Sequence, residues 1–205
     1  MIFAGSRDLM LIFIALELMS IAIYVLTGAN RRDRRAAEAA LKYFLLGAFS
    51  SAFFLFGVAL VYGAAGSTNL VAIADAVGVD GLGASPMMLA GIALLAVGFG
   101  FKVAAVPFHM WTPDAYDGAP APVTGFMAAA VKAAAFAAFI RVFLTAFPSL
   151  HDTWGQVIAG LAVVTMIAAN FVATVEGSVK RMLAYSSIAH AGYLLVALAA
   201  ASTTG

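Results

Sequence analysis

Long apolar runs separated by short polar segments dominate the sequence. A transmembrane helix needs about 20 mainly apolar residues, and six of the runs reach that length. The pattern therefore predicts an all-α fold, a polytopic transmembrane helix bundle that forms a single membrane domain over residues 1–205. The six predicted spans are Leu9–Gly28, Ala36–Gly63, Met87–Trp111, Ala121–Phe147, Thr153–Val175 and Met182–Ala201.

The third predicted span is discontinuous. Gly98 and Gly100 precede Lys102 in this span, and Pro107 follows it. Proline removes a helical hydrogen bond and clashes with the preceding turn. A broken helix at membrane depth is tolerated only where protein buries it or where it lines a wet cavity. We predict non-helical hydrogen bonding between Gly98 and His109, with carbonyl groups left free near Lys102.

The connections between the spans differ in length. The segment Ala64–Ser85 is rich in glycine, serine and asparagine and is followed by Pro86, which predicts a long loop. The segment Thr112–Pro120 is short and polar, which predicts a turn between the third and fourth spans.

Composition narrows the class of protein. The chain is 64% hydrophobic and only 10% charged, whereas soluble domains are about 25% charged. We therefore expect the lipid bilayer and other membrane proteins to be its partners. The net charge of +1 argues against nucleic acid as a partner. The absence of cysteine excludes a disulfide, an iron–sulfur cluster or a zinc–thiolate site built by this chain.

Basic residues predict the orientation in the membrane. Arg31, Arg32, Arg34 and Arg35 lie between the first two spans, and Lys180 and Arg181 lie between the last two. An even number of spans separates these two loops, so they share one side, which the positive-inside rule places in the cytoplasm. The turn with Asp114 and Asp117 falls on that side too, and the rule does not account for its lack of basic residues.

Four titratable side chains on four different spans fall at one predicted depth. Counted from the cytoplasmic ends at about 1.5 Å per residue, Glu17 and Lys132 lie about 16 Å deep, and Lys102 and His190 about 14 Å deep. The hydrocarbon core is about 30 Å thick, so its midplane lies about 15 Å down. Lys42 is shallower, at about 9 Å.

Charges at this depth indicate a function. Each costs on the order of 3 kcal/mol on insertion scales. Glu17, Lys102 and Lys132 would together cost roughly 9 kcal/mol if unpaired, comparable to the stability of a whole domain. We therefore expect them to face the bundle interior, with Glu17 within ion-pair or one-water distance of Lys102. Burial disfavours the charged form of a side chain, and an adjacent opposite charge favours it. A lysine between these influences can change protonation with its neighbour's state, as a proton relay requires.

Structural roles remain open for some of these residues. Glu17 could form a purely structural buried ion pair with the lysines, although an apolar core of equal volume is often as stable. Lys42 could extend its ammonium group to the cytoplasmic interface. His109 could cap a helix or lie at an interface, and His190 could be a core histidine with satisfied hydrogen bonds.

Several stretches resemble a known family. FKVAAVPFHMWTPDAYDGAPAPVTGFMAAAVKAAAF is similar to the signature of the proton-conducting, antiporter-like membrane subunits of respiratory complex I, NADH:quinone oxidoreductase. Subunits of multisubunit sodium/proton antiporters and of some membrane hydrogenases share this segment. SRDLMLIFIALELMSIAIYVLTG and VKRMLAYSSIAHAGY resemble the fifth and tenth helices of the family. EAALKYFLLGAFSSAFFLFGVALVYGAAGSTNL most resembles the subunit N type, the counterpart of NADH dehydrogenase subunit 2.

The resemblance implies a proton relay. Glu17 matches the glutamate that partners the broken-helix lysine, here Lys102, and Lys132 matches the lysine that passes protons to the central axis. Lys42, His109 and His190 match further polar positions of the relay.

The resemblance also implies that the chain is a fragment. It matches helices five to ten of about fourteen, so a complete proton path cannot be assigned to it alone. The implied protein is a multi-pass subunit of the bacterial inner (plasma) membrane, part of a proton-pumping translocase with other membrane subunits as partners. NADH, FMN, iron–sulfur clusters and quinone are expected in partner subunits, and no cofactor or metal site in this one. The open alternatives are a subunit of a sodium/proton antiporter or membrane hydrogenase, and a non-conducting membrane scaffold.

Overall fold

Six helices of the computed structural model are long and apolar enough to cross a membrane, within the part of the chain that the structure describes, residues 1–79, 81, 83 and 85–201. This confirms the predicted all-α membrane bundle and its number of spans. The spans are Leu9–Thr27, Arg34–Ala65, Pro86–Val103, Ala121–Ala146, Pro148–Ala173 and Val179–Ala200. The helices in chain order are α1 (Ile2–Gly5), α2 (Leu9–Thr27), α3 (Arg34–Ala65), α4 (Leu70–Val79), α5 (Pro86–Val103), α6 (Trp111–Gly118), α7 (Ala121–Phe126), the π-helix η2 (Met127–Val131), α8 (Lys132–Ala146), the 3₁₀-helix η3 (Pro148–Leu150), α9 (His151–Ala173) and α10 (Val179–Ala200).

Three segments differ most from the prediction. The third predicted span, Met87–Trp111, was too long, because α5 ends at Val103. The predicted turn Thr112–Pro120 was wrong, since most of it belongs to the helix α6. The predicted long loop Ala64–Ser85 contains a further helix, α4. Short helices in polar or glycine-rich segments lack the long apolar run on which the prediction depended.

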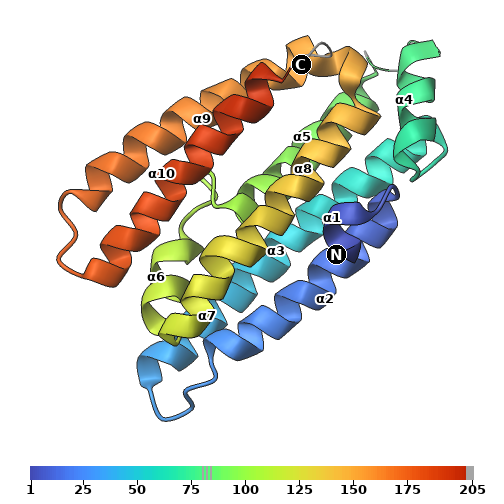
Figure 1. The fold of residues 1–205 in the computed structure, drawn as a ribbon. Helices are drawn as coiled ribbons and strands as arrows, with labels where there is room; N and C mark the ends of the chain where they lie inside the picture. The colour runs from blue at the N-terminus through green and yellow to red at the C-terminus, as the bar shows by residue number, and fades with distance from the viewer. Residues whose placement is uncertain (80, 82, 84, 202–205) are drawn as a thin grey trace.

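The long helices form an elongated bundle (Figure 1). α3 packs against α2, α5 and α6, and α10 packs against α9 and α6. α5 and α8 run between the α2–α3 pair and the α9–α10 hairpin (Figure 1). The loops α2–α3 and α9–α10 lie at the same end of the bundle as α6, which confirms that the two basic loops share one side (Figure 1).

Close backbone contact joins α3 to α5. A Cβ atom added to Gly91 would lie 3.1 Å from the backbone nitrogen of Val61 and 3.2 Å from the carbonyl oxygen of Gly57. Small residues allow such an approach in a membrane, where van der Waals packing replaces the hydrophobic effect between helices. This contact fixes the position of α5, and therefore of Lys102 in its last turn.

Aromatic side chains fill the interior on both sides of that position. In one cluster Phe99 stacks on Phe139, with ring centroids 4.9 Å apart. In the other, Tyr43 stacks on Trp111 at 4.3 Å, and Tyr24 meets Tyr43 edge-on at 4.7 Å. Aromatic pairs at these distances add to the energy of simple area burial. These rings thus form part of two closely packed buried clusters.

Candidate functional site

The break in the third span begins two residues after Lys102, where α5 ends. Ala104 has φ 64°, the left-handed conformation that alanine rarely adopts. Its N–H donates to Phe101 O (3.1 Å), and that of Ala105 donates to Gly100 O (2.8 Å). These two bonds form a Schellman ending. The predicted non-helical hydrogen bonding is confirmed, but the helix ends before Pro107 is reached.

The polar backbone groups of the break find partners on other helices. The N–H of Val106 donates to Thr165 Oγ1 of α9 (2.9 Å), and Trp111 Nε1 donates to the carbonyl of Phe101 (3.0 Å). Buried backbone groups need such partners because an unpaired one is costly in hydrocarbon. The Phe101 carbonyl, next to Lys102, is therefore occupied rather than free as expected.

Lys102 is buried in the bundle, with 4% of its surface exposed. Its ammonium Nζ donates to Ser20 Oγ of α2 at 2.7 Å and lies 5.9 Å from the centre of the Tyr43 ring. The expectation that this lysine faces the interior is confirmed. Its polar partner in the structure is a neutral hydroxyl.

Glu17 and Lys102 do not form a direct ion pair, which was one of the two expected arrangements, and the one-water arrangement stays a prediction. Among the ion pairs of the described residues, none joins these two side chains. Glu17 is half-buried on α2, and its Oε1 accepts a hydrogen bond from the hydroxyl of Ser51 on α3. Lys102 and Ser51 both line a small cavity of about 10 Å³, roughly the volume that one water needs.

Lys132 is the second buried lysine, 7% exposed, and begins α8. Its Nζ donates to the hydroxyl of Ser187 on α10 at 2.7 Å and to the carbonyl of the same residue at 2.9 Å. The π-helix Met127–Val131 directly precedes it. Such wide turns occur mostly as single-turn bulges and frequently at functional sites. The two lysines therefore share two features. Each lies next to a local irregularity in its own helix, and each donates a hydrogen bond to a serine on another helix.

The two histidines are less closely connected to the lysines. His109 lies in the break, half-buried, with its ring 6.3 Å from that of Tyr185. Its Nδ1 is buried and has no hydrogen-bond partner among the described residues. His190 is exposed on α10, with Nδ1 2.8 Å from the carbonyl of Ser186. Ser187 and His190 are three residues apart, so they are neighbours on one face of α10.

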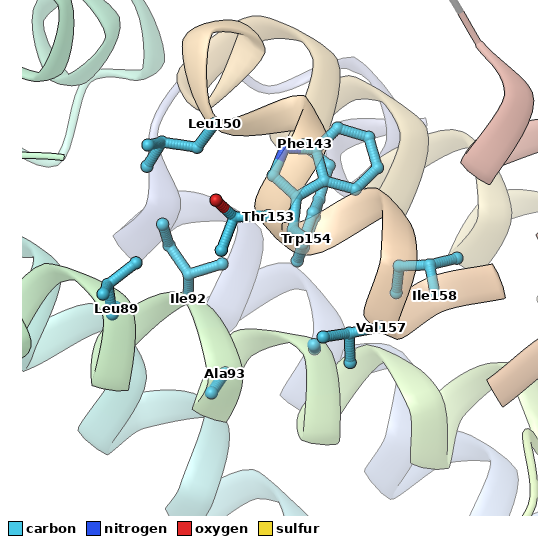
Figure 2. A pocket seen from close by; sticks show the side chains of 10 residues that line it. Leu89, Ile92, Ala93, Phe143, Leu150, Thr153, Trp154, Val157 and Ile158 are labelled. Carbon is cyan, nitrogen blue, oxygen red and sulfur yellow. The ribbon is translucent and has the colours of Figure 1, made fainter. Parts of the chain in front are cut away.

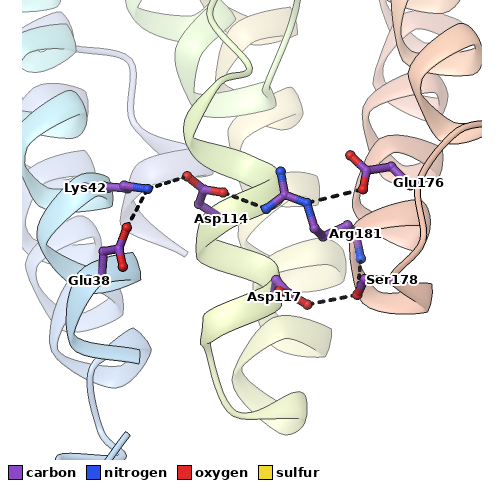
Figure 3. A network of polar contacts seen from close by, with 7 residues as sticks. All are labelled: Glu38, Lys42, Asp114, Asp117, Glu176, Ser178 and Arg181. Carbon is purple, nitrogen blue, oxygen red and sulfur yellow. Dashed lines mark hydrogen bonds and ion pairs between the residues drawn. The ribbon is translucent and has the colours of Figure 1, made fainter. Parts of the chain in front are cut away.

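Lys42 belongs to a different cluster, a network of charged side chains at the end of the bundle that carries the basic loops (Figure 3). Lys42 is exposed and pairs with Glu38 at 2.8 Å and with Asp114 Oδ2 at 3.0 Å. The other oxygen of Asp114 accepts from Arg181 Nη1 at 2.7 Å, and Arg181 reaches Glu176 at 3.4 Å. The network therefore joins α3, α6 and α10 through Asp114, which takes its basic partners from the other two helices.

Burial raises the pKa of Asp114, but its hydrogen bonds to Arg181 and Lys42 outweigh this and hold the pKa below the usual 3.8. A carboxyl group whose pKa is lowered by folding adds stability above its usual pKa. That contribution is lost as the pH falls through the lowered value. The network is therefore fully present at neutral pH and fails only in acid.

We expect Asp114→Asn to loosen α6 from α3 and α10. The predicted loss is roughly 1 kcal/mol of unfolding free energy at neutral pH, a modest figure because solvent screens partly exposed pairs. Thermal unfolding of the full-length protein in detergent measures it, and the difference should shrink in strong acid, where Asp114 is itself protonated. Asp152→Asn is the control, since that side chain is fully exposed. An equal loss in the control would contradict the assignment.

An apolar cavity of about 160 Å³ lies apart from these polar groups, between α5, α8 and α9 (Figure 2). Ile92, Phe143, Val157 and Ile158 contribute to its wall, and Thr153 is the polar side chain near its rim. No titratable side chain lines it. It is therefore not part of the site around the lysines.

The sequence prediction missed the three serines and the π-helix. Ser20 lies one turn after Glu17, and Ser187 lies one turn before His190. Polar residues at this spacing share a helix face with the charged residue, which is the signal that could have identified them.

The chain is similar in sequence and in fold to known proteins. The transmembrane family described as NADH:quinone oxidoreductase/Mrp antiporter matches residues 6–205. The NADH-quinone oxidoreductase subunit N of Trichlorobacter lovleyi is 53% identical over all of this chain and 42% of the relative. Solved structures also contain similar chains. Respiratory complex I from Thermus thermophilus with bound aureothin has one with 47% identity and TM-score 0.82, covering 96% of this chain and 42% of that chain.

A chain of the membrane-bound sulfane sulfur reductase, an archaeal respiratory membrane complex, is 34% identical with TM-score 0.84. That likeness covers 95% of this chain and 39% of the reductase chain. The present chain thus spans about two fifths of the length of the relatives it matches.

Proposed function

The chain belongs to the NADH:quinone oxidoreductase/Mrp antiporter family of transmembrane proteins, and we propose that it is part of a proton-translocating, subunit N type membrane subunit of an NADH:quinone oxidoreductase. The observation that carries the proposal is the state of Lys102 and Lys132. Both are buried at mid-bundle irregularities, and each is hydrogen-bonded to a neutral serine. A purely structural lysine would be expected to hold a fixed carboxylate partner.

The proposed mechanism uses the charge state of Glu17 to control Lys102. A change in a neighbouring subunit alters the coupling between the two side chains. When the coupling weakens, Lys102 releases its proton, since the buried charge has lost its stabilising neighbour. The proton passes to Lys132 and onward along the face of α10 that carries Ser187 and His190. Water in the break bridges gaps too long for direct hydrogen bonds.

His109 and Lys42 are further members of the proposed relay. His109, in the break, extends the polar path beside Lys102. Lys42, at the end of the bundle, connects it to the cytoplasmic side through the Asp114 network.

Redox chemistry takes place in other subunits under this proposal. NADH, FMN, iron–sulfur clusters and quinone would be held there, and the lack of cysteine in this chain agrees with that division. The partners are the adjoining membrane subunits and the lipid bilayer. The location is the bacterial inner membrane, in keeping with the bacterial relative named above.

Three alternatives make different predictions. A sodium/proton antiporter subunit would translocate protons only with sodium countertransport, and a membrane hydrogenase subunit would not depend on NADH. A non-conducting scaffold would hold partner subunits in place whatever the charges at Glu17 and the lysines. The family match includes the antiporters, so sodium dependence must be measured directly.

The test is proton uptake by vesicles that contain the complete complex with the full-length subunit, supplied with NADH and quinone in sodium-free buffer. Uptake that continues without sodium supports the proposal, and uptake that requires sodium favours the antiporter reading.

The variant that accompanies this test is Glu17→Gln, which keeps an oxygen to accept from Ser51 but removes the charge. We expect it to lower the number of protons taken up per NADH several-fold, with Glu17→Asp retaining part of the function. Unchanged uptake in an assembled Glu17→Gln complex would favour the scaffold.

A further inference from the structure

We propose that Ser20 and Ser51 are positioning residues that hold Lys102 and Glu17 apart, so that Lys102 has two alternative partners, the Ser20 hydroxyl and the Glu17 carboxylate. The inference rests on the proposed proton relay and adds the groups that set its coupling. The structure represents the separated state, in which each charged group is bound by its own serine.

Ser20 serves Lys102 as an acceptor. It is fully buried, and its hydroxyl donates its own proton to the carbonyl of Leu16, one turn earlier in α2. Its oxygen is then free to accept from Lys102 Nζ at 2.7 Å. A hydrogen bond to an ionised group is about twice as strong as one between neutral groups. The Ser20 oxygen therefore stabilises the protonated lysine, though less than a carboxylate would.

Ser51 serves Glu17 as a donor. Its hydroxyl, on α3, donates to Oε1 of Glu17. A carboxylate that already accepts a hydrogen bond gives up part of that stabilisation if it turns toward another partner. Glu17 lies one turn from Ser20 on the same face of α2. The Ser51 hydroxyl thus favours the orientation in which Glu17 leaves Lys102 to Ser20.

A small cavity adjoins the Lys102 side chain. It is about 10 Å³ in volume, and Lys102 and Ser51 are both in its wall. Gly47 and Gly98 also line it. A lysine side chain has a flexible four-carbon stem, so under the proposal Lys102 turns from Ser20 toward the carboxylate by rotation of its own bonds.

The other titratable groups around Lys102 do not offer it a negative charge at neutral pH. Tyr24 on α2 and Tyr43 on α3 are the phenols nearest to it. On α8, which packs against α5, Lys132 is bound to Ser187, and Arg141 donates to the carbonyl of Ala4. Glu17 is therefore the carboxylate able to compete with Ser20, among the described residues of the helices that surround Lys102.

The two serines should have opposite effects on the pH dependence of pumping. Ser51→Ala releases Glu17 to pair with Lys102, which then stays protonated to higher pH, so pumping should shift toward alkaline pH. Ser20→Ala removes the acceptor, so Lys102 takes up its proton only at lower pH, and pumping should shift toward acid. We expect a shift of about one pH unit in Ser51→Ala, the lower end for an opposite charge gained nearby, and a smaller shift in Ser20→Ala, which loses a hydrogen bond to the charged form.

The experiment measures initial rates of NADH-driven proton uptake against pH, in vesicles holding the complete complex with the full-length subunit. Ser51→Thr keeps the hydroxyl and should restore the original profile. Thr27→Val is the matched control for Ser20→Ala, since Thr27 is also buried on α2 and donates to the carbonyl four residues earlier. General damage to packing would lower the rate without moving the profile in two directions.

Shifts of the same sign, or no shift in Ser51→Ala, would overturn the inference. If Ser20→Ala fails to assemble, Ser51→Ala and its threonine counterpart decide the matter alone. Lys102→Ala separates this result from the larger proposal. If that variant still pumps, the relay itself is wrong, whereas if it does not pump and the serine variants show unshifted profiles, only the positioning role is wrong.

Discussion

Lys102→Ala in the full-length subunit should abolish proton uptake coupled to NADH oxidation, or reduce it at least tenfold. The side chain is the buried cation nearest Glu17, and alanine leaves no group to carry the proton past the break. Quinone-linked NADH oxidation should fall with it if electron transfer and pumping are tightly coupled. Proton uptake and NADH oxidation are measured together in reconstituted vesicles, with assembly of the complex checked by immunoblot.

Lys102→Arg distinguishes charge from proton transfer at the same position. Arginine keeps the positive charge and can still donate to Ser20, but it stays protonated at physiological pH and cannot release a proton. We therefore expect it to assemble well and to pump poorly. A complex that pumps normally with arginine at this position would show that Lys102 acts only as a fixed charge.

The spans were predictable because their signal is long and redundant. Each consists of about 20 apolar residues, so single polar positions do not hide it. The burial of Lys102 and Lys132 followed from the cost of exposing a charge to hydrocarbon. Both lysines are indeed in the interior. Energy penalties of this size leave few alternatives, which is why these predictions did not require a structure.

The ends of the irregular segments were harder to predict. Pro107 indicated a break, but the helix ends earlier, at a left-handed alanine whose sequence carries no special signal. The π-helix before Lys132 lies in a run of alanines that would fit a regular helix equally well. Such local choices depend on contacts with other helices, including the bond from the Val106 N–H to Thr165.

Partners distant in the sequence were also beyond prediction. Lys42 and Asp114 are 72 residues apart, and Lys102 and Ser20 are 82 apart. Depth and the family resemblance both suggested that Lys102 would meet Glu17. Depth does not specify which way a side chain turns, and in the structure Lys102 and Glu17 each turn to a serine, Ser20 on α2 and Ser51 on α3.

Lys132→Ala should likewise reduce proton uptake at least tenfold, for a related reason. Lys132 is the ammonium group that links α8 to Ser187 on α10, one turn from His190. Without it, a proton released by Lys102 has no buried base to receive it.

Lys42→Ala is the matched comparison, since it also removes one ammonium group, but an exposed one that water can replace. Its effect should be much milder. The two variants are compared by proton uptake per NADH at equal levels of assembled complex. Full pumping by an assembled Lys102→Ala/Lys132→Ala double variant would eliminate the relay and leave the scaffold role standing.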